Sequence, residues 1–153
     1  MIPATTERVP KQTARHINER IHRATEKNLA RYASNRKAID QRLDALDREW
    51  DIERTLEANA AIASLVGLTL GAAVHKRWFL FPAAVAGFLL QHAVQGWCPP
   101  LPVFRRLGFR TQSEIERERT ALKTLRGDFE GLGKRGKGAS KPNVGRVLEA
   151  AER

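Results

Sequence analysis

Two long apolar runs interrupt a chain that is otherwise densely charged. The first, Ala58 to Val74, carries no charged residue, and the second, Trp78 to Trp97, has two glutamines and one histidine as its only polar side chains apart from the tryptophans. Three residues, His75-Lys76-Arg77, separate the runs, which is enough for a turn only. A hydrocarbon core of about 30 Å needs roughly 17–25 helical residues, so each run just reaches the length of a crossing. The pattern predicts a transmembrane helical hairpin over residues 55–97, with helices at about 56–74 and 78–97.

The flanks predict further helices, so we expect an all-α fold. Residues 11–54 contain no Gly and no Pro, which predicts a long amphipathic helical segment, cytoplasmic or juxtamembrane, with a break at Ser34-Asn35. Its apolar residues recur at helical spacing, and its acidic and basic residues stand where intrahelical pairs form. The apolar positions are Ile17, Ile21, Ile39, Leu43, Leu46 and Trp50, and the pairs join Asp40 and Asp44 to Arg48 and join Asp47 and Asp51 to Arg54.

Two interpretations of this segment stay open. It is either a solvated helix with a core-facing stripe, or a coiled coil or a helix lying on the bilayer. Residues 1–10 are expected to be loose, and residues 98–111 are expected to form a Cys-Pro-rich exit loop. A capping box of Thr111 and Glu114 predicts a cytoplasmic helix over 112–126, closed by Gly127. Residues 127–153 are predicted to be a flexible basic tail, in which Asn143 caps a short helix.

Small residues recur at helical spacing in both apolar runs. Gly67 and Gly71 form a GxxxG pair that Ala63 extends by one turn, and Ala83 and Gly87 continue the pattern in the second run. Such residues let helix backbones approach closely in a membrane, where packing drives association. We predict a packing face, directed either at the chain's own second helix or at another copy, which makes a homo-oligomer the expected assembly.

The second run ends in polar residues and carries an aromatic residue at each end. Gln91 and Gln95 share one stripe with His92 as its neighbour, and Trp78 and Trp97 stand where interfacial anchors occur. Buried amides in lipid usually face another helix. The stripe is therefore either hydrated at headgroup level or a functional polar lining.

Positive charge predicts both location and orientation. The 27 Lys and Arg residues divide into 12 before the first run, 2 in the turn and 13 after the second. Cytoplasmic segments carry the excess of Lys and Arg, so both termini are expected in the cytoplasm and the turn on the far side of a bacterial inner membrane. The net charge of +10 suits a bilayer with anionic headgroups. We expect no nucleic-acid partner, because no base-reading motif or aromatic platform accompanies the charge.

No catalytic constellation emerges from the sequence, so the protein is not expected to be an enzyme. Cys98 is the only candidate nucleophile, and Arg105 and Arg106 follow it as cations that would favour a thiolate. Cys98 follows a helix C-terminus, where the negative end of the helix dipole disfavours a thiolate. Two roles for Cys98 therefore stay open, a structural one and one in sulfur or redox chemistry. His16 and His22 are not at ligand spacing on a helix, so no metal and no cofactor are expected.

The helix pair, with Gly96-Trp97-Cys98-Pro99 and then Leu107-Gly108 and Thr111, resembles a bacterial family, the YgaP-like inner-membrane domain of unknown function. That two-helix unit occurs alone or fused to rhodanese sulfurtransferases, and the resemblance covers roughly residues 52–112. It implies homodimeric packing and cytoplasmic termini. It also makes Gly96, Cys98, Pro99, Leu107 and Gly108 the family-like motif.

Three functions follow from these observations. The first is a membrane anchor or assembly unit that associates with itself. The second is an oligomer that passes or senses a small solute, for which a sulfur-containing anion fits Cys98, the polar stripe and the resemblance. The third is a soluble basic helical protein that binds nucleic acid, which requires both apolar runs to form a buried core.

Overall fold

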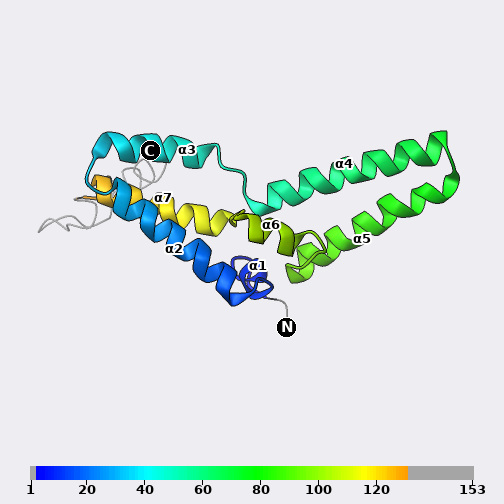
Figure 1. The fold of residues 1–153 in the computed structure, drawn as a ribbon, viewed down its shortest axis with the longest axis horizontal. Helices are drawn as coiled ribbons and strands as arrows, with labels where there is room; N and C mark the ends of the chain where they lie inside the picture. The colour runs from blue at the N-terminus through cyan, green and yellow to red at the C-terminus, as the bar shows by residue number, and fades with distance from the viewer. Residues whose placement is uncertain (1–2, 131–153) are drawn as a thin grey trace, which may run out of the picture. The chain divides into compact units, whose positions relative to one another are not determined.

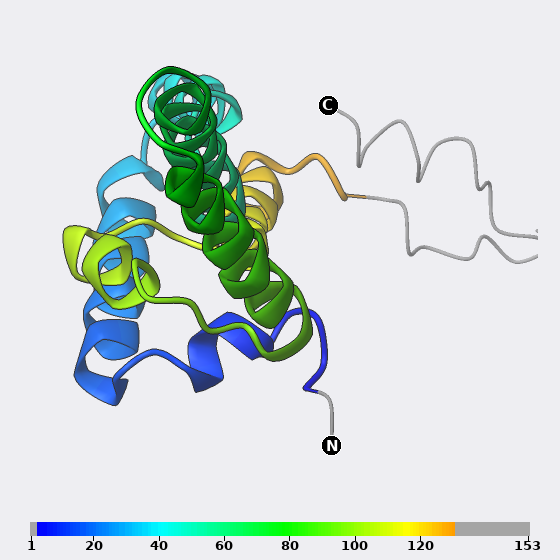
Figure 2. The same cartoon turned by 90° about the vertical axis from the view of Figure 1, so that its right-hand side faces the viewer.

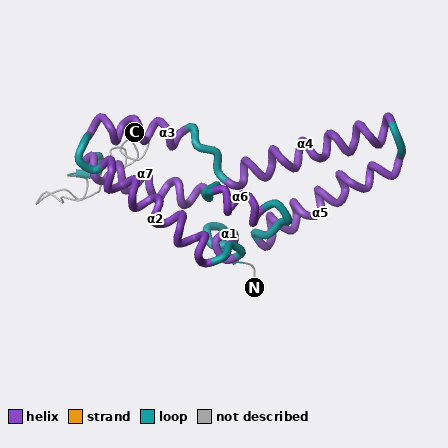
Figure 3. Tube along the Cα trace, in the orientation of Figure 1, coloured by secondary structure: helices purple, strands orange, loops and turns teal. Residues whose placement is uncertain are grey.

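The computed structural model describes residues 3–130 of the chain, and within that range it contains helices and no strand. The prediction of an all-α fold is confirmed. The elements are α1 (Arg8–Lys11), α2 (Arg15–Tyr32), α3 (Arg36–Asp47), α4 (Ile52–Ala73), the 3-10 helix η1 (Lys76–Phe79), α5 (Leu80–Gln95), α6 (Leu101–Leu107) and α7 (Gln112–Arg126). Figure 1 labels the α-helices. Short turns join the helices, as Figure 3 shows.

The chain divides into two compact units. The hairpin unit combines Met1–Ala24 with Glu49–Ile115, and the ion-pair unit combines Thr25–Arg48 with the described portion of Glu116–Arg153. The two apolar runs belong to the hairpin unit. Each unit has its own buried groups and is described separately.

In the hairpin unit, helices α4 and α5 run side by side in opposite directions, and η1 joins them at the turn (Figures 1 and 2). The Asp51 carboxylate caps α4 by accepting a hydrogen bond from the Arg54 backbone N–H at 2.7 Å. The helix therefore begins at Ile52, four residues earlier than the start at Leu56 that the sequence predicted. The turn is closed by His75, whose Nδ1 accepts from the Arg77 N–H at 3.1 Å. The sequence predicted this charged triplet as the turn.

The core of the hairpin unit lies where the two long helices meet their flanks. Val9, Ile52, Leu56, Cys98 and Leu101 are buried together. Two expectations were wrong here. Residues 1–10 are not wholly loose, because α1 places Val9 in this core. The exit segment is not all loop, because α6 forms within it and accommodates a proline in its first turn, where no intrahelical N–H bond is needed.

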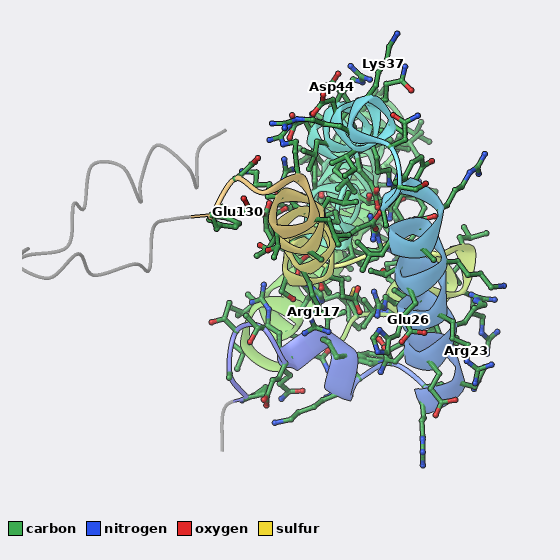
Figure 4. All side chains as sticks on the ribbon, turned by 90° about the vertical axis from the view of Figure 1, so that its left-hand side faces the viewer. Arg23, Glu26, Lys37, Asp44, Arg117 and Glu130 are labelled. Carbon is green, nitrogen blue, oxygen red and sulfur yellow. The ribbon has the colours of Figure 1, made fainter. Side chains whose placement is uncertain are left out.

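The ion-pair unit is held by contacts between α3 and α7. Asp40 accepts from Arg126 at 2.6 Å, and Asp47 pairs with Arg119, so the two helices run antiparallel. The expectation that Asp40 and Asp47 pair within their own segment was wrong, because their carboxylates bond Arg126 and Arg119 of α7. Figure 4 shows Lys37 and Asp44 pointing away from α3 on its outer face.

The apolar stripe is buried at most, but not all, of its predicted positions. Ile39, Leu43 and Leu46 are buried on α3, and Ile17 and Ile21 are buried on α2, as the spacing predicted. Trp50 is 46% exposed, because α3 ends at Asp47 and the helical register is lost before Trp50. The long amphipathic segment is therefore two helices, with Asn35 capping α3 at the predicted break.

The capping box of α7 is confirmed. The Glu114 N–H donates to Thr111 Oγ1 at 3.2 Å, and the Thr111 N–H donates to the Glu114 carboxylate at 2.8 Å. Gly127 closes the helix with a left-handed φ of 91°. The predicted basic tail beyond residue 130 and its short helix lie outside the described residues.

Candidate functional site

The most unusual surface of the hairpin unit is apolar and belongs to α4 and α5. No charged side chain stands on α4 after Glu57 or anywhere on α5. Large apolar side chains are exposed along both helices, with Leu65 at 64%, Leu80 at 73% and Leu90 at 67%. Soluble monomers rarely expose contiguous apolar patches beyond a few hundred Å², and a surface of this kind is typical of a contact with a membrane or with another protein.

Two helical stretches are long and apolar enough to cross a membrane: Arg36–Ala73, which contains α4, and Lys76–Gln95. Core helices of soluble proteins pass the same test, but they are mostly buried. Here 17% of the apolar window in the first stretch and 6% in the second is buried. Within the described chain, both apolar windows are mostly exposed.

The glycines of the first run pack against the chain's own second run. A Cβ added at Gly71 would lie 2.7 Å from the Phe79 ring, and one at Gly67 would lie 2.7 Å from Pro82 Cδ and 2.8 Å from Phe81. Ala63, one turn earlier, is half-buried. The GxxxG face therefore closes the hairpin near its turn.

The small residues of the second run have a different setting. Gly87 has no heavy atom within 4 Å of an added Cβ, and Ala83 is exposed. Within the described chain, these two residues form no contact surface with α4 of the kind that Gly67 and Gly71 provide. The structure leaves this face of α5 open.

The family-like motif has a structural explanation at its first residue. Gly96 ends α5 with a left-handed φ of 77°, and an added Cβ would lie 2.5 Å from the backbone carbonyl of Arg8. Only glycine meets both demands. Gly108 ends α6 in the same conformation with open space around it, while Leu107 and Pro99 are exposed.

Cys98 is a buried core residue and not an activated thiol. It is 4% exposed, and burial raises the pKa of its thiol. Arg105, which the sequence suggested as its activating cation, is bound elsewhere. Its guanidinium donates to both oxygens of Glu114 at 2.7 and 2.8 Å and to Asn18 Oδ1 at 2.9 Å. The arrangement supports the structural role for Cys98.

The ion pairs of the hairpin unit join α6 to the segments around it. The Arg105 side chain is fully buried and also bonds Thr13 Oγ1 and the Phe109 carbonyl. Burial alone would raise the pKa of Glu114, but hydrogen bonds from Arg105 and Thr111 outweigh it and hold that pKa below its usual value. Arg110 makes a second bidentate pair with Glu49 at 2.7 Å.

The predicted polar stripe divides in the structure. Gln95 is exposed, Gln91 is half-buried and His92 is 5% exposed. Neither ring nitrogen of His92 has a hydrogen-bond partner among the described residues. Its neighbour Arg8 donates to the Ala93 carbonyl at 2.9 Å and lies 3.8 Å from Glu53, whose pKa is raised by burial. No sequence pattern connects the N-terminal Arg8 to this place.

The two tryptophans that the sequence predicted as interfacial anchors lie at the two ends of the hairpin, and a third tryptophan lies near the start of α4. Trp78 is 44% exposed near the turn, and Trp97 is half-buried against the core at the opposite end. The Arg54 guanidinium lies 4.3 Å from the ring centre of Trp50, which precedes the start of α4. This stacked pair holds Trp50 at the surface beside α4, a position that the stripe interpretation missed.

A cavity of about 170 Å³ lies between α4 and α5 on the side away from the turn. Figure 1 shows the two helices drawing apart in that direction. Its walls come from one stretch of each helix, and residues 98–100 close one side. The helical wall residues are Leu56, Asn59, Ala60 and Ala63 from α4 and Val85, Phe88 and Leu89 from α5. We call this space the hairpin cavity.

Of the candidate residues from the sequence, Ala63, Cys98 and Pro99 line the hairpin cavity, and the residues of the polar stripe do not. Among the described residues there is also no group of three His, Cys, Asp or Glu side chains able to hold a metal. Cavity walls depend on how two helices diverge, and no spacing in the sequence shows that.

Comparison with known proteins identifies no relative. No family model, no curated protein and no solved structure matches the chain.

Proposed function

We propose that the protein is a small two-pass membrane protein whose hairpin, residues 56–74 and 78–97, anchors it in a bacterial inner membrane. The single observation that carries this is the exposed apolar surface of α5 and of α4 beyond Glu57, which has no charged side chain. Lipid is the phase that such a surface requires. Apart from the groups of its first and last turns, a helix satisfies its backbone N–H and C=O groups internally, as a hydrocarbon core demands.

The flanks complete this proposal. With 12 and 13 Lys and Arg residues on the two sides and 2 in the turn, both termini face the cytoplasm and its anionic lipids. Self-association uses the open face of α5 at Ala83 and Gly87, because Gly67 and Gly71 are taken by the chain's own turn. The resemblance to the YgaP-like domain agrees with these features and stays a prediction.

The other two functions have less support. A solute-passing oligomer needs the polar stripe to line a path, and Gln91, His92 and Gln95 do not line the hairpin cavity. A soluble nucleic-acid binder needs both apolar runs buried, whereas they are exposed in the described chain. The role of anchor and assembly unit is the one that the geometry favours.

The anchoring proposal predicts that the protein stays in the membrane pellet after carbonate extraction and after about 1 M salt, which shortens the screening length to about 3 Å. Salt does not weaken apolar contact with lipid, whereas it removes a protein attached by its basic flanks. Immunoblotting of pellet and supernatant measures the result, and release by salt alone would rule out the hairpin.

A matched pair of variants sharpens this experiment. Leu65→Arg places a charge in the middle of α4, which costs about 2.5–3.5 kcal/mol on insertion scales, so less protein should reach the pellet. Leu107→Arg is the control, because Leu107 is exposed to a similar extent as Leu65 but lies on α6 outside the hairpin. Equal behaviour of the two variants would contradict the proposal.

A further inference from the structure

His92 is buried in the last turn of α5 without a polar partner. Its side chain is 5% exposed, and neither ring nitrogen bonds another of the described residues. A neutral imidazole loses its hydrogen bonds to water in such a place, whereas a protonated one would also bury a charge that nothing compensates. Histidine is the side chain that ordinarily gains its proton within the physiological pH range. His92 is therefore the point at which acid would add a buried charge to the hairpin unit.

The charged groups near His92 come from α1 and α4. Arg8 of α1 donates to the carbonyl of Ala93, the residue next to His92, at 2.9 Å. Glu53 of α4 lies 3.8 Å from the same guanidinium, so this carboxylate already serves as the counterion of Arg8. Helix α5 has no charged side chain of its own, and the His75-Lys76-Arg77 triplet lies at the opposite end of the hairpin. A protonated His92 would therefore stand beside Arg8 without an anion of its own.

The N-terminal segment occupies the C-terminal carbonyls of α5. A helix C-terminus favours a cation, and Arg8 supplies one through its bond to Ala93. Gln12 Nε2 also donates to the Gln95 carbonyl, at 3.5 Å. A second cation at this helix end would repel the first, because like charges close together in a buried place disfavour each other. Protonation of His92 therefore competes with the bond between Arg8 and α5.

Helix α1 covers buried apolar groups at the same end of the hairpin. Val9, next to Arg8, is 1% exposed and shares the core with Ile52 and Cys98. Gly96 allows this close approach, since an added Cβ there would lie 2.5 Å from the Arg8 carbonyl. If Arg8 leaves α5, the core loses the side chain of Val9, and Cys98 becomes accessible to reagents in solution.

We propose that His92 is a proton-sensitive latch for α1. While His92 is neutral, Arg8 holds α1 on the end of α5. When the imidazole takes a proton from solvent, the new cation replaces Arg8 at the helix end, and α1 leaves the core. The latch goes beyond the anchoring role and does not depend on the membrane location, since all of its groups belong to the hairpin unit.

The accessibility of the Cys98 thiol measures the latch. The full chain in mild detergent reacts with dithiodipyridine, and the rate is compared with that of the denatured chain at the same pH, which removes the intrinsic effect of pH on the thiol. Protection of wild-type Cys98 should fall several-fold between about pH 7.5 and about pH 5, the range in which histidine gains its proton. Glu114, whose pKa is held below its usual value, stays largely ionised over this range.

His92→Leu and His92→Gln leave no titratable group at this position, so their Cys98 protection should be the same at both pH values. The pair distinguishes loss of the proton site from a change in packing, because one replacement is apolar and the other polar. His75→Gln is the matched control, because His75 is an exposed histidine at the other end of the hairpin, and it should respond to acid as the wild type does. Wild-type protection that does not change with pH, or an equal fall in both His92 variants, would overturn the proposal.

Two further variants separate the latch from other causes of exposure in acid. Burial raises the pKa of Glu53, so protonation of that carboxylate would also free Arg8. Glu53→Gln should weaken protection at both pH values and keep the fall in acid, whereas loss of the fall in this variant alone would assign the titration to Glu53 and overturn the proposal. Leu122→Cys in a Cys98→Ala chain reports on the ion-pair unit, where Leu122 is 0% exposed. It should stay protected in acid, and its exposure there would show general unfolding and no latch.

Discussion

Replacing Arg105 by Met is expected to lower the free energy of unfolding of the hairpin unit by about 3–5 kcal/mol, the cost of breaking a buried ion pair by removing one partner. Arg105 is 0% exposed, and its guanidinium bonds the Glu114 carboxylate twice. Without it, the Phe109 carbonyl and Asn18 Oδ1 lose this donor, and Glu114 keeps the Thr111 N–H but loses its partner charge. Thermal and denaturant unfolding in mild detergent, followed by circular dichroism, measures the loss.

Arg106→Met is the matched control, because Arg106 is the next residue on α6 and its side chain is exposed. A surface change of this kind usually stays within about 0.5 kcal/mol. Similar losses in the two variants would show that Arg105 contributes only as one surface charge among many.

The same ion pair makes stability depend on acid. The folded pKa of Glu114 lies below its unfolded value, so the carboxylate stabilises the fold above the unfolded pKa, and that contribution is lost as the pH falls through the folded pKa. Arg105→Met should lose most of this acid-dependent contribution. Identical acid titrations for wild type and variant would contradict the assignment.

Replacing Gly71 by Ile is expected to destabilise the hairpin by about 1–3 kcal/mol, the range for overpacking a filled site, without changing the oligomeric state. A Cβ at this position already lies 2.7 Å from the Phe79 ring, so the larger side chain must push η1 away from α4. Thermal unfolding and crosslinking in membranes measure the two effects separately.

Gly87→Ile gives the opposite expectation. Gly87 has open space around it, so a branched side chain there costs the monomer little and blocks close approach of a second copy. The dimer fraction should fall while the melting temperature changes little. If Gly71→Ile abolishes crosslinking and Gly87→Ile does not, the GxxxG face joins two copies and the assignment of the two faces must be reversed.

The sequence predicted features that depend on local spacing. The helix pair, the turn at His75 and the capping box of Thr111 and Glu114 depend on residues a few positions apart, whose physical preferences act locally. The stripe at Ile39 and Leu43 was correct for the same reason. Trp50 was assigned wrongly because the helix ends before it, and no strong stop signal marks that end.

The features that the sequence did not predict depend on tertiary contact. Arg105 is one of 27 cationic side chains, and nothing nearby in the sequence distinguishes a buried guanidinium from a solvated one. Its partner Asn18 is 87 positions away. The pairing of Asp40 with Arg126 and the packing of Gly96 against Arg8 have the same origin. The hairpin cavity depends on how far two helices diverge, which no residue pattern specifies.

The central claim is that the two apolar helices cross a membrane and return. Single cysteines at Lys76, Ser34 and Ser140, each in a Cys98→Ala background, test it with a membrane-impermeant maleimide on intact spheroplasts and on lysed ones. We expect the cysteine at position 76 to be labelled in intact spheroplasts, and those at 34 and 140 only after lysis. Labelling at position 76 that also requires lysis would contradict the hairpin crossing.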